Sequence, residues 1–199
     1  MTLGQTNKSA VRQQLREALN NLSPQQLHEK SVAACSLITS SLEFVRARVV
    51  MMYLSMEREV DTATIARKAW QQGKTVAVPK ISWEGKRMLP TEITSLHTGI
   101  TTTGPGVREP IGGKPVPVGE IDLVIVPGLG FSLLGYRIGR GMGFYDRFLA
   151  QGDFAGVSCG LAFEEQVVPE LPVLDHDIPL SMLATDRALR RFTMNAAEK

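Results

Sequence analysis

The densest group of residues able to do chemistry lies in the segment 135–149, which reads GYRIGRGMGFYDRFL. Within it, Gly139, Gly141 and Gly143 stand at alternate positions. Glycine lets the backbone adopt positive φ and approach a ligand closely, so successive amide groups can form a nest for phosphate oxygens. A helix that begins at the end of such a loop adds partial positive charge. The pattern is therefore typical of a phosphate-binding loop.

Charged side chains lie among these glycines and help to decide whether the loop binds phosphate. Arg137, Arg140 and Arg147 supply donors whose planar geometry suits phosphate oxygens. Asp146 is a candidate ligand for Mg²⁺, which proteins usually hold with one or two carboxylates together with phosphate oxygens and waters. The segment matches neither of the two standard nucleotide-binding signatures, and on spacing alone a glycine-rich turn without a ligand explains it equally well. The arginines and Asp146 favour phosphate.

Strands and helices that alternate along the chain must position this loop. Apolar runs predict buried strands at 49–54, 75–78 (ended by Pro79), 121–126 and 157–162, and an edge strand at 189–192. Helical periodicity predicts helices that begin near Lys8, at Pro24 behind an N-cap Ser23, after a cap at Asp61 or Thr62, and at Phe144. A hairpin is expected around 83–86 and an irregular loop at 98–117.

This alternation predicts an α/β layered fold with a mostly parallel sheet. Ligands in such folds bind beyond the carboxyl ends of the strands, so the loop after the strand 121–126 is the expected site. The 199 residues suit one domain, 1–199, with 193–199 as a frayed tail.

Composition narrows the class of protein. Hydrophobic residues make up 43% and charged residues 21%, as in globular proteins. The two cysteines, Cys35 and Cys159, form no CxxC pair, which argues against a zinc knuckle or a disulfide framework. No apolar leader and no run of transmembrane length occurs, so we expect a cytoplasmic protein with no membrane partner. A net charge of +2 and an aromatic content of 6% argue against a nucleic-acid partner.

The central segment resembles the signature of the 5-formyltetrahydrofolate cyclo-ligase family. VPGLGF at 126–131 and the segment 135–149 carry this resemblance. Weaker pieces follow the family's order and spacing: KSAVR at 8–12, YLSM at 53–56 with EVDT at 59–62, GVREP at 106–110, and LP at 171–172 with HDIP at 176–179. Together they extend from about Lys8 to Phe192, nearly the whole chain.

The resemblance implies a three-layer α/β/α fold with a mostly parallel sheet, similar to that of sugar-phosphate isomerases and CoA-transferases. It implies a ligase that forms a C–N bond, converting 5-formyltetrahydrofolate to 5,10-methenyltetrahydrofolate while ATP becomes ADP and phosphate. The implied chemistry is phosphorylation of the formyl oxygen followed by attack of N10, with Mg²⁺ as a further cofactor. The partner is a small folate, with or without a polyglutamate tail, and the protein is expected to be a monomer.

The resemblance also assigns roles to individual residues. The residues implied to bind ATP are Lys8, Arg12, Arg137, Ile138, Gly139, Arg140, Gly141, Met142, Gly143, Phe144 and Tyr145. Those implied to bind the folate are Leu54, Glu59, Arg140, Gly141, Met142, Gly143 and Phe144. Arg140 and Tyr145 are the implied catalytic residues, and Asp146 and Asp177 the implied Mg²⁺ ligands.

The residues alone allow simpler interpretations. Lys8 and Arg12 lie one helical turn apart and suit a solvated helix face. Asp146 can complement a helix N-terminus, and Asp177 can be a turn residue before a proline. Glu59 can be a surface charge at a strand–helix junction.

Two positions depart from the family pattern. Met142 occupies a variable position where some relatives carry lysine, so one cation is missing, and Ser181 stands where relatives often have aspartate. These departures support one alternative, a non-catalytic folate- or nucleotide-binding paralogue. A second alternative is a phosphosugar isomerase that uses Glu59 or Glu109 for acid–base chemistry. ATP dependence separates the isomerase from the ligase.

Overall fold

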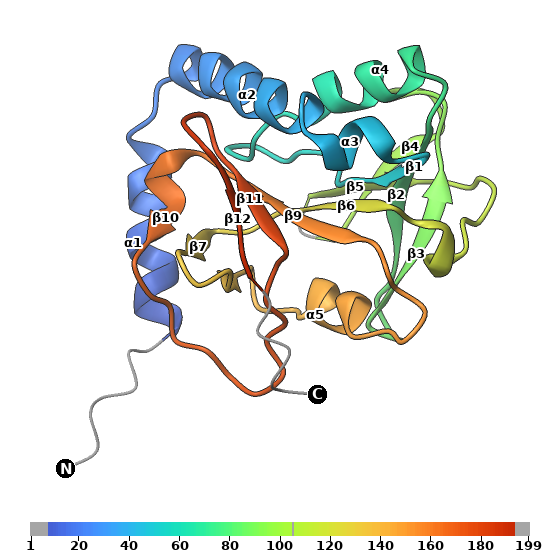
Figure 1. Cartoon of the computed structure of the whole chain (residues 1–199). Coiled ribbons are helices and arrows are strands. Elements are labelled where there is room, and N and C mark those ends of the chain that lie inside the picture. The colour runs from blue at the N-terminus through green and yellow to red at the C-terminus, as the bar shows by residue number, and fades with distance from the viewer. Residues whose placement is uncertain (1–7, 105, 194–199) are drawn as a thin grey trace.

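The computed structural model describes residues 8–104 and 106–193, so the predicted tail beyond Thr193 lies outside the described residues. A seven-stranded sheet forms its centre, in the order β12-β11-β9-β6-β1-β2-β3 (Figure 1). Its strands are β1 (Val49–Met51), β2 (Thr75–Ser82), β3 (Arg87–Glu92), β6 (Leu123–Val126), β9 (Val157–Leu161), β11 (Met182–Ala184) and β12 (Leu189–Arg191).

The inner strands of this sheet are parallel. Parallel pairs join β2 to β1, β1 to β6, β6 to β9 and β9 to β11. The edge strands β3 and β12 run antiparallel to their neighbours. The predicted mostly parallel sheet is therefore confirmed, and so are the hairpin between β2 and β3 and the edge strand near 189–192.

Helices cover both faces of the sheet, which gives the expected three layers (Figure 1). On one face lie α2 (Pro24–Thr39), α3 (Leu42–Arg46) and α4 (Ala63–Gln71), and on the other lies α5 (Phe144–Leu149). The remaining helical elements are α1 (Lys8–Asn20), η1 (Val118–Glu120) and η2 (Glu164–Gln166). The predicted capping box at Ser23 and Gln26 is present at the start of α2.

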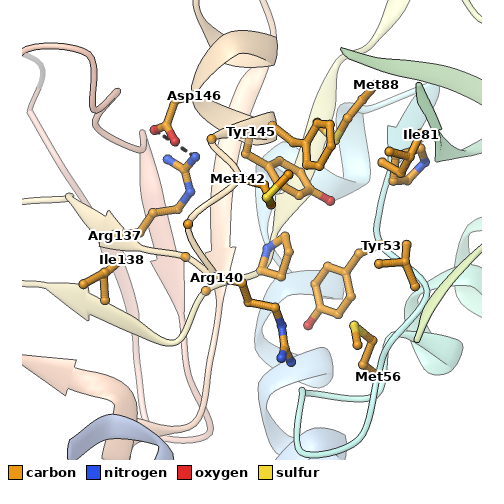
Figure 2. A pocket seen from close by; sticks show the side chains of 18 of the residues that line it. Tyr53, Met56, Ile81, Met88, Arg137, Ile138, Arg140, Met142, Tyr145 and Asp146 are labelled. Atoms are coloured by element: carbon orange, nitrogen blue, oxygen red, sulfur yellow. Dashed lines mark hydrogen bonds and ion pairs between the residues drawn. The ribbon is translucent and has the colours of Figure 1, made fainter. Parts of the chain in front are cut away.

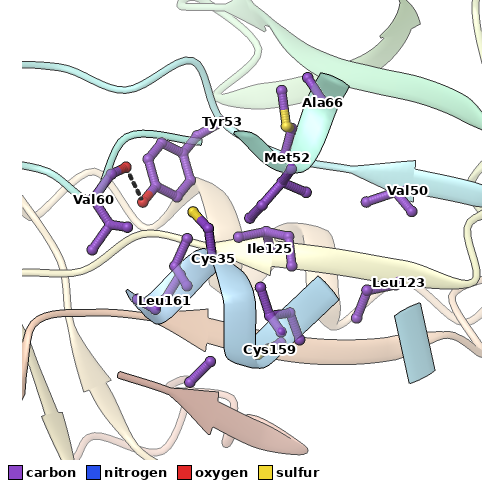
Figure 3. Close-up of a cluster of buried hydrophobic side chains, with 14 of the residues drawn as sticks. Cys35, Val50, Met52, Tyr53, Val60, Ala66, Leu123, Ile125, Cys159 and Leu161 are labelled. Carbon is purple, nitrogen blue, oxygen red and sulfur yellow. Dashed lines mark hydrogen bonds between the residues drawn. The ribbon is translucent and has the colours of Figure 1, made fainter. Parts of the chain in front are cut away.

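Alternate side chains of β6 enter the hydrophobic clusters on opposite faces of the sheet, so the sheet lies between two layers of helices. Leu123 and Ile125 join the core cluster beneath α2, α3 and α4 (Figure 3). Val124 and Val126 belong to the cluster on the opposite face, which also contains Phe148 of α5. All four side chains of β6 are fully buried. A strand covered on both faces reads as a continuous apolar run, which is why this one was easy to predict.

A smaller sheet carries the glycine-rich segment. It pairs β10 (Val167–Val168) with β7 (Gly130–Ser132) and β7 with β8 (Arg137–Ile138). Leu15 of α1 packs with Leu129 and Ile138, and a Cβ on Gly130 would lie 3.1 Å from Leu15 Cδ2. The missing side chain at Gly130 therefore lets α1 approach this sheet closely.

Two local predictions are wrong. Pro79 does not end its strand, because β2 runs on to Ser82, with Pro79 opposite Pro90 of β3. The parallel partner β1 pairs only as far as Ala77, so no ladder on that side needs a proline amide. The expected irregular loop 98–117 instead contains an antiparallel hairpin of β4 (Ile100–Thr103) and β5 (Val107–Pro110).

Other boundaries shifted by a few residues. The predicted strand 49–54 ends at Met51, and the predicted strand 121–126 begins at Leu123. The short elements α3, β7, β8, β10 and β11 were not predicted, since each is too short to show a period. Within residues 8–104 and 106–193, we find no helix long and apolar enough to span a bilayer.

Gly156 tests the close packing of β9 against β6. A Cβ there would meet the backbone carbonyl of Ile121 and would lie 2.9 Å from the carbonyl oxygen of Asp122. Since backbone atoms cannot move aside as a side-chain end can, Gly156→Ala should lower the free energy of unfolding by roughly 1–3 kcal/mol. Gly152→Ala, where a Cβ meets nothing within 4 Å, is the matched control. Urea denaturation measures both, and equal effects would contradict the packing argument.

Candidate active site

A cavity of about 350 Å³ opens beyond the carboxyl ends of the central strands (Figure 2). Tyr53 and Leu54 follow β1, Pro79 lies in the second half of β2, and Pro127 and Gly128 follow β6. The position agrees with the expectation for an open α/β sheet. The cavity brings together all the residues that were predicted to form the site: Lys8, Arg12, Leu54, Glu59, Arg137, Ile138, Gly139, Arg140, Gly141, Met142, Gly143, Phe144, Tyr145, Asp146 and Asp177. Their individual roles stay predictions.

The glycine-rich loop is closed at its two ends by an ion pair. Arg137 Nη2 lies 3.0 Å from Asp146 Oδ1 (Figure 2). Arg137 Nη1 also donates to the carbonyl oxygen of Ile178 at 3.2 Å. The amide of Ile178 in turn donates to the same carboxylate oxygen at 3.3 Å. The Arg137 side chain is only 4% exposed. Burial lowers the pKa of Arg137 while Asp146 raises it, and a guanidinium keeps its charge under such opposed effects.

Helix α1 contributes cations from a second direction. Lys8 Nζ lies 2.5 Å from Asp177 Oδ2, and Arg12 Nε donates to the carbonyl oxygen of Gly139 at 2.9 Å. The same oxygen of Asp177 accepts from the amide of Leu174 at 2.7 Å. Lys8 and Arg12 therefore face the cavity and do not form a purely solvated helix face.

The other end of the cavity is organised around Glu59. Its Oε2 accepts from the amide of Met56 at 3.0 Å, and its Oε1 lies 3.2 Å from Arg140 Nη2. The side chain of Glu59 is 15% exposed, so it is not a simple surface charge. The adjacent Arg58 adopts a φ of 63° and donates from Nη1 to the carbonyl oxygen of Leu19 at 3.1 Å, at the end of α1. The Glu59 segment is thus fastened to α1.

Tyr145 brings an uncommitted hydroxyl to the cavity. This hydroxyl is shielded from solvent and has no hydrogen-bond partner in the part of the chain that the structure describes. Burial raises the pKa of Tyr145, and the charge of Glu59 raises it further, so the group stays protonated at neutral pH. The neighbouring Tyr53, by contrast, donates to the carbonyl oxygen of Val60 at 3.0 Å. Only Tyr145, of this pair, is left able to donate to a ligand.

Three residues considered from sequence lie elsewhere. Arg147 is not among the residues that line the cavity, and its guanidinium is bound by two backbone carbonyls. Glu109 is 6% exposed and accepts from the amide of Ile81 at 2.6 Å, which leaves it a structural role. Ser181 Oγ lies 3.2 Å from Ser158 Oγ, between β9 and β11. The departure from aspartate at Ser181 therefore does not alter the lining of the cavity.

Asp146 and Asp177 are compatible with Mg²⁺ bound together with phosphate. The amide of Ile178, which follows Asp177, contacts Asp146, so the two carboxylates lie on adjoining segments. Among residues 8–104 and 106–193, no three His, Cys, Asp or Glu side chains gather into a metal site. A donor set of two carboxylates matches an ion that takes its other ligands from phosphate oxygens and water, and not a structural metal.

Some lining residues were missed by sequence reasoning. Tyr53, Ile81, Arg108 and Leu174 border the cavity. Tyr53 had a usable signal, since it follows a buried strand at the sheet's carboxyl edge. Arg108 lies in GVREP, one of the weaker pieces of the family resemblance, but no role was predicted for it. Ile81 had no signal, because it lies past the proline taken as a strand end.

Fold and cavity together define a class: an α/β protein with a glycine-rich, arginine-lined site beyond its strand ends. The model of the 5-formyltetrahydrofolate cyclo-ligase family matches residues 4–186, and the chain belongs to this family.

Relatives and solved structures agree with this assignment. The chain is 28% identical to the mouse 5-formyltetrahydrofolate cyclo-ligase, covering 86% of this chain and 89% of that one. It is also 28% identical to the Escherichia coli K12 enzyme of the same name, covering 86% of this chain and 96% of that one. Among solved structures, Aquifex aeolicus 5,10-methenyltetrahydrofolate synthetase aligns with a TM-score of 0.81 at 30% identity, covering 96% of both chains. The Mycoplasma pneumoniae synthetase aligns with a TM-score of 0.73 at 19% identity, covering 91% of this chain and 99% of that one, and shows the shared fold.

The buried ion pair predicts a large difference between two arginines of the same cavity. Arg137→Met leaves Asp146 without its partner, so the free energy of unfolding should fall by about 3 kcal/mol or more. Arg140→Met breaks a pair whose arginine is 46% exposed, and should cost about 1 kcal/mol or less. Chemical denaturation at neutral pH measures both variants. Similar losses would mean that burial does not set the strength of these pairs.

Proposed function

We propose that this protein catalyses the ATP-dependent closure of 5-formyltetrahydrofolate to 5,10-methenyltetrahydrofolate, with release of ADP and phosphate. Membership of the cyclo-ligase family supports the reaction. The observation that carries the proposal to this chain is that the glycine-rich loop, the cations of α1 and Glu59 all border one cavity.

In the proposed function, one end of the cavity binds the phosphates of ATP and the adjoining end binds the folate. ATP transfers its terminal phosphoryl group to the formyl oxygen and becomes ADP. When N10 attacks the formyl carbon, this oxygen departs as part of the released phosphate. Phosphoryl transfer requires chiefly positioning and neutralisation of charge. Lys8, Arg12 and Arg137 with the loop amides suit the phosphates, and Asp146 and Asp177 suit Mg²⁺.

At the folate end, the carboxylate of Glu59 suits the amino and ring N–H groups of the pterin. Arg140, which is paired with Glu59 and stands between Gly139 and Gly141, lies between the two ends. Tyr145 offers a protonated hydroxyl that can donate to an oxygen of the reacting groups. We assign catalytic roles to Arg140 and Tyr145 on this basis.

A non-catalytic paralogue is the competing proposal. The observation that favours it is the uncharged Met142 at a position where some relatives carry lysine. Met142 lines the cavity, is 47% exposed, and brings no charge. The remaining cations of the cavity argue that charge neutralisation does not depend on this position. The cytoplasmic location, the monomeric state and the acceptance of polyglutamate tails stay predictions, which fractionation, light scattering and tailed substrates can test.

The first measurement is the rise in methenyl-folate absorbance when purified protein meets 5-formyltetrahydrofolate, ATP and Mg²⁺. We expect a rise that needs all three components. Binding of folate or ATP by calorimetry without any rise would support the non-catalytic paralogue instead. Turnover without ATP would exclude the ligase reaction.

Two substitutions separate the ends of the cavity. Arg140→Ala should weaken ATP binding far more than folate binding, by roughly tenfold or more for a lost charged contact. Glu59→Gln keeps the size of the side chain but loses the charge, and should raise the KM for the folate while leaving the KM for ATP close to that of the unsubstituted protein. Equal losses for both ligands in Arg140→Ala would count against a phosphate contact there.

The metal assignment has its own test. Asp177→Asn should raise the Mg²⁺ concentration needed for half-maximal rate by roughly tenfold, because Mg²⁺ prefers a charged carboxylate ligand. Asp153→Asn, at an exposed position outside the cavity, is the control and should leave that concentration unchanged. An unchanged Mg²⁺ response in Asp177→Asn would remove Asp177 from the ligand set.

A further inference from the structure

Arg147 joins two segments that wall the cavity, although it does not line the cavity itself. Its Nε donates to the carbonyl oxygen of Lys86 at 2.8 Å, in the turn between β2 and β3. Its Nη2 donates to the carbonyl oxygen of Met142 at 2.6 Å, in the glycine-rich loop. One planar guanidinium thus spans two backbone segments that lie more than 50 positions apart in the sequence.

The same side chain is packed as well as hydrogen-bonded. The Arg147 guanidinium lies over the ring of Phe144, with 5.5 Å between its carbon and the ring centroid. Phe144 in turn meets Trp83 edge to face, with 5.6 Å between centroids. Phe144 and Trp83 both line the cavity and together form what we call the aromatic wall. Arg147 packs against this wall through Phe144.

The backbone on both sides of this contact is constrained. Gly143 has a φ of 62° and Lys86 a φ of 48°, both in the left-handed region. A Cβ on Gly143 would lie 3.0 Å from Arg147 Nη1, so a side chain at this position would displace the guanidinium. Non-glycine residues rarely hold such a φ unless their surroundings fix it, and the bond from Arg147 to Lys86 is such a restraint.

We propose that Arg147 is a positioning residue, which holds the Met142–Gly143 part of the glycine-rich loop against the β2–β3 turn. In this role it sets the distance between the glycine-rich loop and the aromatic wall of Phe144 and Trp83. The sequence pattern had suggested a phosphate contact, but Nε and Nη2 of Arg147 both donate to backbone carbonyl oxygens. The kinetic part of the test rests on the proposed function, whereas the fluorescence part does not.

The test compares Arg147→Met and Arg147→Lys with the unsubstituted protein. Methionine removes both donors, and a lysine ammonium cannot reproduce the two-pronged fork, so its effect should be intermediate. Arg67→Met, an exposed arginine on α4, is the control. We expect the KM for ATP to rise by roughly tenfold in Arg147→Met, with a smaller fall in kcat and no change in Arg67→Met.

A second readout needs no activity. The chain has two tryptophans, Trp70 and Trp83, so a Trp70→Phe background leaves Trp83 as the only tryptophan. Acrylamide should quench Trp83 fluorescence more strongly once Arg147 is replaced, because Phe144 is no longer held against Trp83 and the indole becomes more accessible. If unsubstituted protein shows no turnover but quenching rises in the variant, the proposed reaction fails and the positioning role stands.

Other outcomes overturn the proposal. Unchanged quenching with an unchanged KM for ATP would mean that Arg147 holds nothing that matters to the site. Unchanged quenching with a fall in kcat alone would indicate direct participation in the reaction. If Arg147→Met does not fold, Arg147→Lys in the same two measurements gives the decision.

Discussion

The ion pair between Arg137 and Asp146 is the constraint on which the site depends. These residues stand at the two ends of the glycine-rich loop, and their side chains meet at 3.0 Å in a mostly buried setting. A loop with three alternate glycines has high conformational freedom, which opposes any single arrangement. Closing it with a buried pair that also binds Ile178 limits this freedom. The pair therefore lets the loop keep glycine where a ligand approaches without losing a defined shape.

The second constraint is the fixed placement of α1. Gly130 lets Leu15 pack closely, and Arg12 binds the carbonyl oxygen of Gly139 in the loop. At its other end, α1 offers carbonyl oxygens to Arg58, which precedes Glu59. Cations near a helix C-terminus are favoured by the exposed carbonyls and the dipole. As a result one helix connects the phosphate end of the cavity to the Glu59 end, and a shift of α1 would disturb both.

Sequence could predict the parts of this arrangement that follow from local pattern. Buried strands such as β6 and the capped start of α2 carry strong periodic or capping signals, and strand ends locate the site in a parallel sheet. Residue types indicated a phosphate-binding loop, and the family resemblance identified the other side chains that gather there, but neither says what each one touches. Arg147 was expected at phosphate because arginine beside glycines suits that role, yet its acceptors are the carbonyls of Met142 and Lys86. The second acceptor depends on where a hairpin lies in space, which no local pattern encodes.

Charge balance explains how several cations share a cavity with apolar walls. Lys8 is paired with Asp177, Arg137 with Asp146 and Arg140 with Glu59. An unpaired charge in a partly buried site would be strongly destabilising, whereas a paired and hydrogen-bonded one is tolerated. Three cations of the cavity thus come with their own carboxylates, Arg12 donates to a backbone carbonyl oxygen, and the neutral Met142 adds no further charge to compensate. Because arginine has five donors, Arg137 and Arg140 can keep their carboxylates and still present N–H groups to an anion, so the site need not be dismantled for one to bind.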